Sequence, residues 1–420
     1  MNETKTISRN LPMIIATLVI GTLAGTSSML LSLFLDQVER FFLGFNENFQ
    51  QPVAINALPI RRLGSVLVGG IIAALIWYWL QKRYSPVKIQ DAIENGAPMP
   101  FWYTWVHVLT QIFFVGTGGS IGRELAPREA GAMLAHQWTK LSRRFPRMNL
   151  SPEDRRLLIA SAAGAGFAGV YIAPITGMMF ALELLYKKIS ARAIAVSLTS
   201  SVIATLIGSL AKGWDPYYHV TNLNFSAKSI PWVLVLGLLM GIGGTWFKAG
   251  IKKAGQRRFK DQRLLVTLPV VALLTGIIAM GFPQIMGNGR GIAQLAIDTT
   301  SISTGTIAIM VSALLAKAIV TLMTIAGGGY GGTLTPSIAV GAAAGIVVGT
   351  LWMQFIGGDV LLSQCAIVGA AALLTASQQA PLMSLFMITE VCHLNYSALM
   401  SLGLAVAVSI AVSKLMQGRH

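Results

Sequence analysis

The sequence predicts an all-α polytopic membrane protein, built from two inverted-topology repeats of tilted and broken helices. Three observations lead to this prediction: an apolar composition, long apolar runs separated by basic loops, and similar motifs in the two halves of the chain. Of the 420 residues, 54% are hydrophobic and only 11% are charged. Soluble globular proteins carry about 25% charged residues. The chain therefore has too little polar surface for a soluble protein, and that class is excluded.

Apolar runs follow one another along the chain, at lengths that suit helices crossing a bilayer, for which about 20 residues are needed. They are Leu11–Leu35, Gly64–Leu80, Phe101–Ile121, Leu157–Tyr186, Ala193–Leu210, Ile230–Trp246, Leu264–Met280, Gly305–Ile325, Thr333–Ile356, Cys365–Val391 and Ser397–Val412. The first run is too long for a signal peptide and shows no clear cleavage site, so we expect a retained first spanning helix. We expect one transmembrane domain over residues 1–420, without a cytoplasmic regulatory domain.

Basic residues gather in the loops between the apolar runs. The chain has 32 Lys and Arg against 16 acidic residues, a formal charge of +16. Clusters lie within 82–88, 140–156, 187–192 and 248–263. Membrane proteins keep such loops on the cytoplasmic side, so we expect all four clusters there. Arg61 and Arg62 lie at a predicted outer boundary and do not fit this rule. Nucleic-acid binding motifs are absent, and we expect no nucleic-acid partner.

Two pairs of similar motifs indicate an internal repeat. The first pair consists of Gly118–Ser120 and Gly331–Thr333, and the second consists of Ala173–Glu183 and Ala380–Glu390. In each member of the second pair, a glutamate follows an Ala-Pro step, nine residues after the proline. Helices broken at matching places in two halves point to a transport site near the middle of the membrane. We place the two halves approximately at 11–210 and 230–412.

Few acidic residues lie at membrane depth. They are Glu124, Glu129, Glu183 and Glu390. An ionisable group there costs about 2.5 kcal/mol or more, so each is either a functional candidate or is compensated by a neighbour or a helix end. Glu124 follows the glycine-rich segment Gly118–Gly122 and precedes Pro127, which favours a helix start near Glu124. The free N–H groups of a helix start attract anions. A carboxylate could occupy that site when ionised and leave it when protonated.

The segment Gly327–Pro336 repeats this arrangement in the second half of the chain. It offers the backbone N–H groups of Thr333 and Leu334 at a second helix start. A nucleotide-binding P-loop would need Lys followed by Ser or Thr after the glycines, and Thr333-Leu334 does not supply it. Neither HExxH nor CxxC spacing is present, and no Ser/His/Asp constellation is evident. We therefore expect no metal, no cofactor and no enzymatic activity.

These motifs resemble those of the CLC family of chloride channels and proton–chloride exchangers. Gly122-Arg123-Glu124 resembles the GREGP motif of the gating glutamate, and Gly332–Pro336 resembles GxFxP. The two Ala-Pro segments resemble those that follow these motifs in the family. The resemblance covers nearly the whole membrane domain, and it implies a chloride pathway in a bilayer with Glu124 as its gate. It also implies anion contacts at Gly122, Arg123, Leu125, Thr333 and Leu334.

The resemblance implies a homodimer in which each subunit holds its own pore, located in the cytoplasmic membrane of a bacterium. We expect passive or gated chloride transport. The alternatives are proton-coupled chloride exchange and transport of another small anion such as fluoride. A secondary transporter of an organic solute is an alternative of a different class, but it would need a roomier cavity lined by recognition side chains. The motifs offer mainly backbone donors and hydroxyls.

Departures from the family pattern affect the anion site. The family's GSGIP segment is replaced by Arg83–Val87, so Tyr84 or Ser85 replaces its anion-binding serine, or neither does. Leu125 stands where GREGP has glycine, and the proline comes one residue later. Leu334 takes the place of the aromatic residue of GxFxP. The anion-contacting tyrosine of the family would fall near Gly418–His420, where the chain has none.

A further departure affects the proton path. The position that resembles the inner proton-relay glutamate of the exchangers is Leu184. Loss of this carboxylate favours a channel or an unusual exchanger. The neighbouring Glu183 could substitute for it, although it would point about 100° away on an α-helix.

Overall fold

The computed structural model describes residues 2–48, 50–221, 225, 229–358 and 360–418. Over these residues it consists of helices, with a single isolated β-bridge and no strand. The predicted all-α class is confirmed. The chain divides into two compact units. Unit 1 comprises Met1–Phe34, Leu80–Thr110 and Glu124–Asp215, and unit 2 comprises Leu35–Trp79, Gln111–Arg123 and Pro216–His420.

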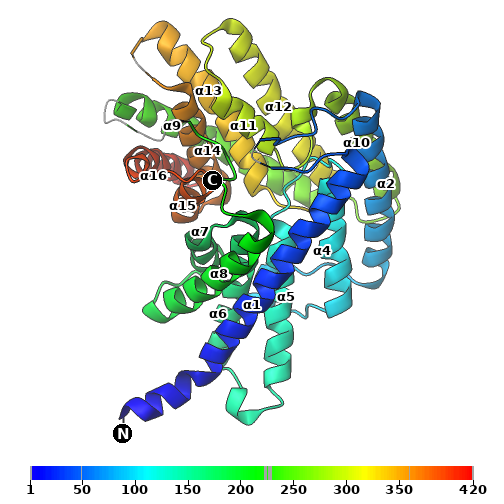
Figure 1. The fold of residues 1–420 in the computed structure, drawn as a ribbon, viewed down its shortest axis with the longest axis vertical. Coiled ribbons are helices and arrows are strands. Elements are labelled where there is room, and N and C mark those ends of the chain that lie inside the picture. Colours follow the sequence, from blue (N-terminus) through cyan, green and yellow to red (C-terminus); the bar gives the residue numbers. More distant parts are fainter. Residues whose placement is uncertain (1, 49, 222–224, 226–228, 359, 419–420) are drawn as a thin grey trace. The chain divides into compact units, whose positions relative to one another are not determined.

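Unit 1 is organised around α6, whose residues from Leu157 to Tyr171 are all buried. Its helices are the first part of α1 (Asn2–Leu43) and of α4 (Phe101–Gly116), with α3 (Ile89–Glu94), α5 (Leu125–Ser142), η1 (Pro146–Met148), α6 (Pro152–Tyr171), α7 (Pro174–Met179), η2 (Phe180–Tyr186) and α8 (Ala191–Lys212). Helix α6 packs against α5, α7 and α8 (Figure 1). A Cβ on Gly131 would lie 2.2 Å from the Ala162 carbonyl oxygen. Small residues thus let the helix backbones approach closely.

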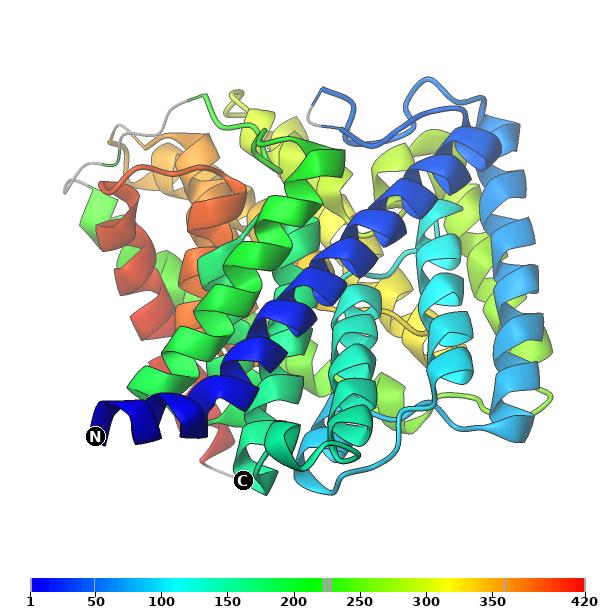
Figure 2. The same cartoon turned by 60° about the horizontal axis from the view of Figure 1, so that its bottom comes forward.

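Unit 2 is organised in the same way around α14. Its helices are the last parts of α1 and α4, with α2 (Pro59–Arg83), which ends in unit 1, α9 (Ile230–Gln256), α10 (Leu264–Gly281), η4 (Pro283–Ile285), α11 (Arg290–Asp298), α12 (Thr304–Ala326), α13 (Leu334–Phe355), α14 (Leu362–Gln378), α15 (Pro381–Val391) and α16 (Ala398–Gln417). Helix α14 packs against α13, α9 and α16 (Figure 2). A Cβ on Gly341 would lie 2.6 Å from the Gly369 carbonyl oxygen, so this packing also depends on a small residue.

The two Ala-Pro segments break their helices with the same backbone geometry. Helix α6 ends at Ile172, whose φ is +53°, and Ala173 (φ −132°, ψ 75°) leads into α7. Helix α14 ends at Gln379, whose φ is +59°, and Ala380 (φ −135°, ψ 80°) leads into α15. The breaks expected from the sequence are therefore present. The glycines between 164 and 169 lie inside the continuous α6 and serve packing rather than the break. The repeat halves 11–210 and 230–412 stay a prediction.

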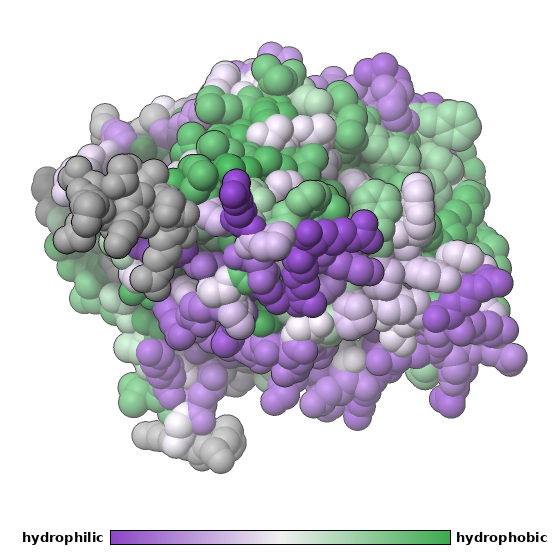
Figure 3. All heavy atoms as spheres, turned by 90° about the horizontal axis from the view of Figure 1, so that it is seen from below, coloured by the Kyte–Doolittle hydropathy of each residue, from purple (hydrophilic) through white to green (hydrophobic). Residues whose placement is uncertain are grey.

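Large apolar side chains cover much of the surface. Eight of the described helices are long and apolar enough to cross a membrane: α1, α2, α8, α9, α10, α12, α13 and α16. In most of them half or less of the apolar window is buried, and outward residues such as Leu238 and Ile277 are large and apolar. Figure 3 shows hydrophobic side chains over part of one face and hydrophilic ones gathered beside them. A surface of this kind suits contact with lipid, and the prediction of a polytopic membrane protein is confirmed.

Among the described helices that the predicted apolar runs do not contain, the two longest are α5 and α11. Helix α5 carries Arg128 and Glu129 near its start, and α11 begins at Arg290. All three charged side chains are buried. Charged residues lower the apolar signal of a segment, and here partners inside the fold allow their burial. Sequence patterns cannot reveal such partners in advance.

Arg61 and Arg62 bind carbonyl oxygens at the ends of helices in unit 2. Arg61 donates to the carbonyls of Phe41 and Phe42 in the last turn of α1, each at 2.9 Å. Arg62 donates to the Ala279 carbonyl of α10 at 2.7 Å. The last carbonyls of a helix lack partners within the helix and attract cations. These contacts give the two arginines a structural role that is independent of the charge rule for loops.

Candidate functional site

Two glycine-rich loops in unit 2 follow the same course. Gly118 has φ +107° and Gly328 has φ +110°, a region that side chains with a Cβ rarely enter. After each of them, the next residue closes a turn on the helix before it. The Gly119 N–H donates to the Phe114 carbonyl and the Gly329 N–H to the Thr324 carbonyl, both at 2.9 Å. The similarity expected between the two motifs therefore extends to the backbone.

The two loops are joined by a pair of reciprocal hydrogen bonds. The Gly122 N–H donates to the Gly332 carbonyl at 2.9 Å, and the Gly332 N–H donates to the Gly122 carbonyl at 2.7 Å. A Cβ on Gly331 would lie 2.8 Å from the Gly122 carbonyl oxygen, so this contact requires glycine. Along the chain, Glu124 and Leu334 each follow their bridge residue by two positions. The sequence analysis predicted two similar loops but did not predict that they pair.

Both helices that follow the loops begin where the sequence analysis expected. Helix α5 begins at Leu125, with Glu124 as its N-cap residue, and the Glu124 side chain is fully buried without capping the helix. The Glu124 carbonyl accepts a hydrogen bond of 2.7 Å from Arg128 Nε. Helix α13 begins at Leu334 after Thr333, whose side chain also makes no cap bond. Neither helix start is therefore capped by the side chain of its own N-cap residue.

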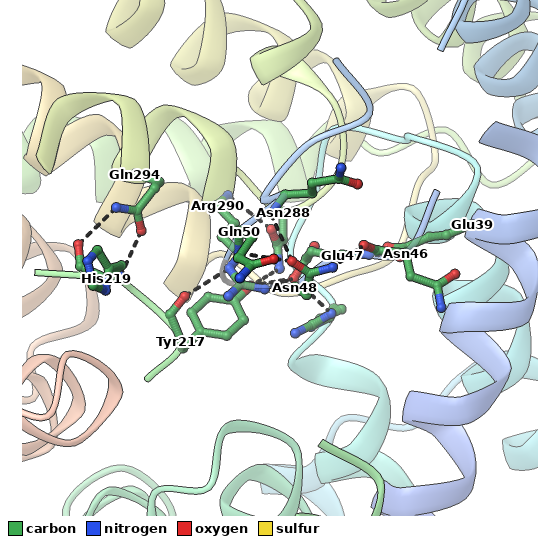
Figure 4. Close-up of polar contacts among 12 residues, drawn as sticks. Glu39, Asn46, Glu47, Asn48, Gln50, Tyr217, His219, Asn288, Arg290 and Gln294 are labelled. Atoms are coloured by element: carbon green, nitrogen blue, oxygen red, sulfur yellow. Dashed lines mark hydrogen bonds and ion pairs between the residues drawn. The ribbon is translucent and has the colours of Figure 1, made fainter. Parts of the chain in front are cut away.

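Buried charges surround Arg123, the residue just before Glu124. Arg123 is 4% exposed, and its Nη1 lies 3.2 Å from Glu47 Oε1. The same Glu47 oxygen lies 3.1 Å from Arg290 Nη1 and accepts a hydrogen bond of 3.2 Å from the Tyr217 hydroxyl. Figure 4 shows Glu47, Tyr217, Asn288 and Arg290 in one polar cluster. One carboxylate oxygen thus connects two arginines and a tyrosine, a set that we call the Glu47 cluster.

Tyr217 contributes both its ring and its hydroxyl to the Glu47 cluster. The guanidinium carbons of Arg123 and Arg290 lie 5.3 and 4.1 Å from the centre of its ring. Burial raises the pKa of Tyr217, so its hydroxyl stays protonated and donates to Glu47. The Asn288 amide donates to that hydroxyl at 2.7 Å. With two arginines and one carboxylate, the cluster carries a net positive charge and fixes Arg123 in place.

The structure also reveals a buried cation that the sequence analysis missed. Lys317 of α12 is 0% exposed, and its ammonium donates to Ser120 Oγ at 2.8 Å and to the Gly287 carbonyl at 2.7 Å. Ser120 belongs to the first glycine-rich loop. An ionisable residue inside a membrane-length run is a functional candidate by default. In the sequence, Lys317 stands within the apolar run Gly305–Ile325. The sequence analysis considered only acidic residues as charged groups at membrane depth.

Tyr84 and Ser85, the two candidates for the missing serine, lie in unit 1. The Tyr84 hydroxyl donates to the Pro98 carbonyl, and its ring stacks on Tyr103 with centroids 5.6 Å apart. Ser85 is exposed. The Tyr84 oxygen is thus held by one protein partner, and the Ser85 hydroxyl faces outward. The end of the chain, where a tyrosine would be expected, includes Arg419 and His420, which lie outside the described residues.

Glu183 and Leu184 lie in η2, a seven-residue π-helix. Both side chains are half-buried. A π-helix has more residues per turn than an α-helix, so successive residues are separated by less than about 100°. The separation of Glu183 from Leu184 that we expected for an α-helix is therefore too large. Glu390 is also half-buried and is the last residue but one of α15.

Comparison with known proteins decides the family. The model of the family described as "Voltage gated chloride channel" matches residues 69–414, which is most of the chain. The chain belongs to this family. The resemblance to CLC proteins, expected from the motifs, is thereby confirmed. Members of this family are channels or transporters.

Individual relatives agree with the family assignment. The chain is 28% identical over 419 residues to a voltage-gated ClC-type chloride channel, ClcB, of Salmonella dublin, with 96% of each chain covered. It is 26% identical over 388 residues to ClcB of Escherichia coli O17:K52:H18, with 90% of each covered. A slow cyanobacterial Cl⁻/H⁺ antiporter has a similar solved structure, with a TM-score of 0.80 and 19% identity, covering 97% of this chain and 95% of the other.

A CLC-type fluoride/proton antiporter is also similar in structure. Its TM-score is 0.68 at 21% identity, and the match covers 96% of this chain and 95% of the other. At these identities the structural matches show a shared fold, and the CLC fold class is confirmed.

The Glu47 cluster leads to a prediction about stability. Glu47→Gln removes the carboxylate that compensates two buried guanidinium groups. We expect the free energy of unfolding to fall by about 3 kcal/mol, because an uncompensated buried charge is costly. Unfolding of the purified protein in mixed micelles measures this change.

Glu94→Gln is the matched control, because Glu94 and its partner Lys187 are exposed and lie 3.7 Å apart. We expect that variant to change stability by no more than about 0.5 kcal/mol. Equal effects of the two substitutions would contradict the role given to the Glu47 cluster.

Proposed function

We propose that this protein carries chloride across the membrane of a bacterium through a pathway that the Glu124 side chain gates. One observation supports the proposal above all others. Glu124 is a fully buried carboxylate at the start of α5, two residues after the hydrogen-bonded pair Gly122–Gly332. A carboxylate in this position lies where an anion would otherwise interact with a helix start. The relatives named ClcB are described as chloride channels, which supports the same substrate.

In this proposal, backbone N–H groups hold the anion. The resemblance to the family motifs supports two sets of donors, namely Leu125 at the start of α5 in unit 1, and Thr333 and Leu334 at the start of α13 in unit 2. Gly122 gives the first loop its close approach to the second, and Arg123 adds positive charge. A point anion suits such a site, because N–H groups and helix dipoles supply positive potential without a bulky recognition pocket.

The gate operates by competition between two anions. An ionised Glu124 occupies the position that chloride would take, and protonation removes its charge and its affinity for the N–H groups. Chloride then enters the vacated position. Buried Lys317 and the net charge of the Glu47 cluster favour entry of an anion into unit 2, because a low-dielectric interior strengthens their attraction. The gate therefore opens more often at low pH.

The absence of a carboxylate at Leu184 favours passive conduction or an unusual exchanger. A second candidate function is proton-coupled exchange, and a specific observation favours it. Unit 1 contains a buried imidazole–carboxylate pair, His107 and Glu129, with Nε2 and Oε2 3.4 Å apart. Such a pair can bind and release a proton at membrane depth.

The experiment that tests the function measures flux from proteoliposomes loaded with chloride. Chloride efflux and the pH of the medium are recorded together, and a parallel set is loaded with fluoride. We expect chloride efflux that rises as the pH falls, and the pH trace then separates passive conduction from exchange. Absence of chloride efflux would overturn the proposal, and efflux in the fluoride set alone would reassign the substrate.

Removing the charge of Glu124 tests the gate. We expect Glu124→Gln to conduct chloride at a rate that no longer depends on pH, because the amide cannot titrate. Glu94→Gln, at an exposed position, should keep the pH dependence of the unchanged protein. If Glu124→Gln retained that dependence, the gate would have to be another residue.

Tyr84 and Ser85 are proposed to supply the hydroxyl that the family's serine provides. We expect Tyr84→Phe or Ser85→Ala to weaken chloride binding, as measured by calorimetric titration, while the thermal unfolding midpoint stays unchanged. The exposed Ser301 offers a matched control, Ser301→Ala. If the chloride affinity were unchanged in both variants, neither hydroxyl would bind the anion, and backbone N–H groups would be its donors.

We further propose that the protein is a homodimer in the cytoplasmic membrane, with one pathway in each subunit. Exposed apolar faces on the spanning helices are suited to contact with lipid or with a second copy. Light scattering in detergent should give the mass of two chains in each particle. The mass of one chain would contradict the dimer.

A further inference from the structure

A pair of buried titratable side chains in unit 1 belongs to none of the family motifs. His107 lies on α4 and Glu129 on α5, and their Nε2 and Oε2 atoms are 3.4 Å apart. The two side chains are only 4% and 8% exposed. An imidazole and a carboxylate buried together can share a proton, because the charge on either group is stabilised by the other. Burial of two such groups in a membrane protein has a cost that packing alone does not explain.

A small cavity lies beside this pair. Among the residues that line it are His107, Glu129, Tyr84, Tyr103 and Thr104. Its free volume of about 10 Å³ is close to the space that one water molecule needs. Three hydroxyl-bearing side chains, an imidazole and a carboxylate would give a water molecule there several hydrogen-bonding partners. The pair can therefore exchange protons with water.

The same cavity is connected to the sequence that we assign to the cytoplasmic side. Pro86 and Val87 also line it, and they lie within the segment that contains the basic residues Lys82, Arg83 and Lys88. Basic loops face the cytoplasm in membrane proteins. Burial raises the pKa of Tyr84, whose hydroxyl stays protonated and acts only as a neutral partner to water. The pair thus lies between a cytoplasmic loop and the start of α5.

Glu124 lies at the start of α5 and precedes Glu129 along that helix. Glu129 follows Glu124 by five residues, which corresponds to about 7.5 Å along the helix axis. Between them, Arg128 interacts electrostatically with both glutamates and with Tyr171 of α6. An arginine keeps its proton under all ordinary conditions, so Arg128 stabilises the two carboxylates without passing a proton itself. A proton moving between Glu129 and Glu124 needs a water molecule as the carrier.

Other titratable or charged groups lie on every element near the pair. They are Tyr84 before α3, Asp91 and Glu94 on α3, Tyr103 on α4, Glu124, Arg128 and His136 on α5, Tyr171 on α6 and Glu183 on η2. Glu94 pairs with Lys187 at the surface. In the part of unit 1 that the structure describes, His107 and Glu129 place an imidazole beside a buried carboxylate.

We propose that His107 and Glu129 form a proton-binding site that carries protons between cytoplasmic water and the Glu124 gate. This inference rests on the proposed function, because it concerns the proton that opens that gate. The pair takes the role of the relay glutamate, whose position is occupied by Leu184 in this chain. It provides this chain with a route to proton-coupled transport that uses residues outside the family motifs.

The transfer involves one proton and no other bond change. A hydronium ion in cytoplasmic water protonates the neutral His107 ring and becomes a water molecule. The imidazolium N–H bond at Nε2 then breaks as an O–H bond forms on the ionised Glu129 carboxylate, which leaves both groups neutral. The Glu129 O–H bond then breaks, and the proton passes through water to the Glu124 carboxylate, where a new O–H bond forms. Glu129 is again ionised and can accept the next proton from His107. Each cycle moves one proton inward or outward, according to the gradient.

The experiment compares Glu129→Gln and His107→Gln with the unchanged protein in chloride-loaded proteoliposomes. Both substitutions keep a polar side chain of similar size but cannot carry a proton. We expect the proton movement per chloride ion released to fall about tenfold or more, as for the loss of a general acid–base group. His136→Gln is the control, because His136 is a half-buried histidine on α5, the helix that carries Glu129. That variant should keep the proton movement of the unchanged protein.

Two further variants separate a proton-carrying role from a merely structural one. The double variant His107→Gln with Glu129→Gln replaces the pair by two amides that can bind each other. The exchanged variant His107→Glu with Glu129→His keeps an imidazole beside a carboxylate. We expect the exchanged variant to recover proton movement and the double variant to lack it, although both fold, as judged by gel filtration and thermal unfolding. A folded exchanged variant that does not recover proton movement, or a folded double variant that keeps it, would overturn the proposal.

The same assay distinguishes failure of this inference from failure of the proposed function. If the unchanged protein releases no chloride, the proposed function is wrong. If it releases chloride without any movement of protons, the function stands and the proton-binding site is wrong. Proton movement that is equal in the unchanged protein and in Glu129→Gln also overturns the site. Chloride flux with proton movement that depends on both residues supports it.

Discussion

The reciprocal hydrogen bonds between Gly122 and Gly332 are the constraint on which the candidate site depends. They join two loops that are 210 positions apart in the chain, and they do so without any side chain. Each loop reaches this contact through a glycine with positive φ, and Gly331 leaves no room for a Cβ near the Gly122 carbonyl. A side chain at position 331 would push the two loop backbones apart.

Buried charges around these loops are arranged by shared contacts rather than by isolated pairs. One Glu47 oxygen is bound by Arg123, Arg290 and Tyr217, and the Lys317 ammonium is bound by Ser120 and backbone carbonyls. Burying a charge without partners would cost several kcal/mol. Sharing partners permits a surplus of positive charge inside unit 2. Such a surplus attracts anions.

The chain keeps the family's fold while changing several of its motif residues. Backbone geometry is retained at the glycine loops and at both Ala-Pro breaks, which depend on φ and ψ and not on side-chain chemistry. Side-chain chemistry differs from the family motifs at Leu125, Leu184 and Leu334. His107 and Glu129 place titratable groups on α4 and α5, outside those motifs.

By itself, the sequence determined the membrane class, the apolar runs, the helix start after Glu124 and the two Ala-Pro breaks. Composition, proline and glycine act locally, so their effects can be predicted without the fold. Only the tertiary structure decided that Gly122 pairs with Gly332, that Glu47 lies between two arginines, and that His107 meets Glu129. It also revealed α11 and the extent of α5, whose charged residues weaken the apolar signal. These features join residues far apart in the chain, and a contact between distant residues leaves no periodic pattern in one sequence.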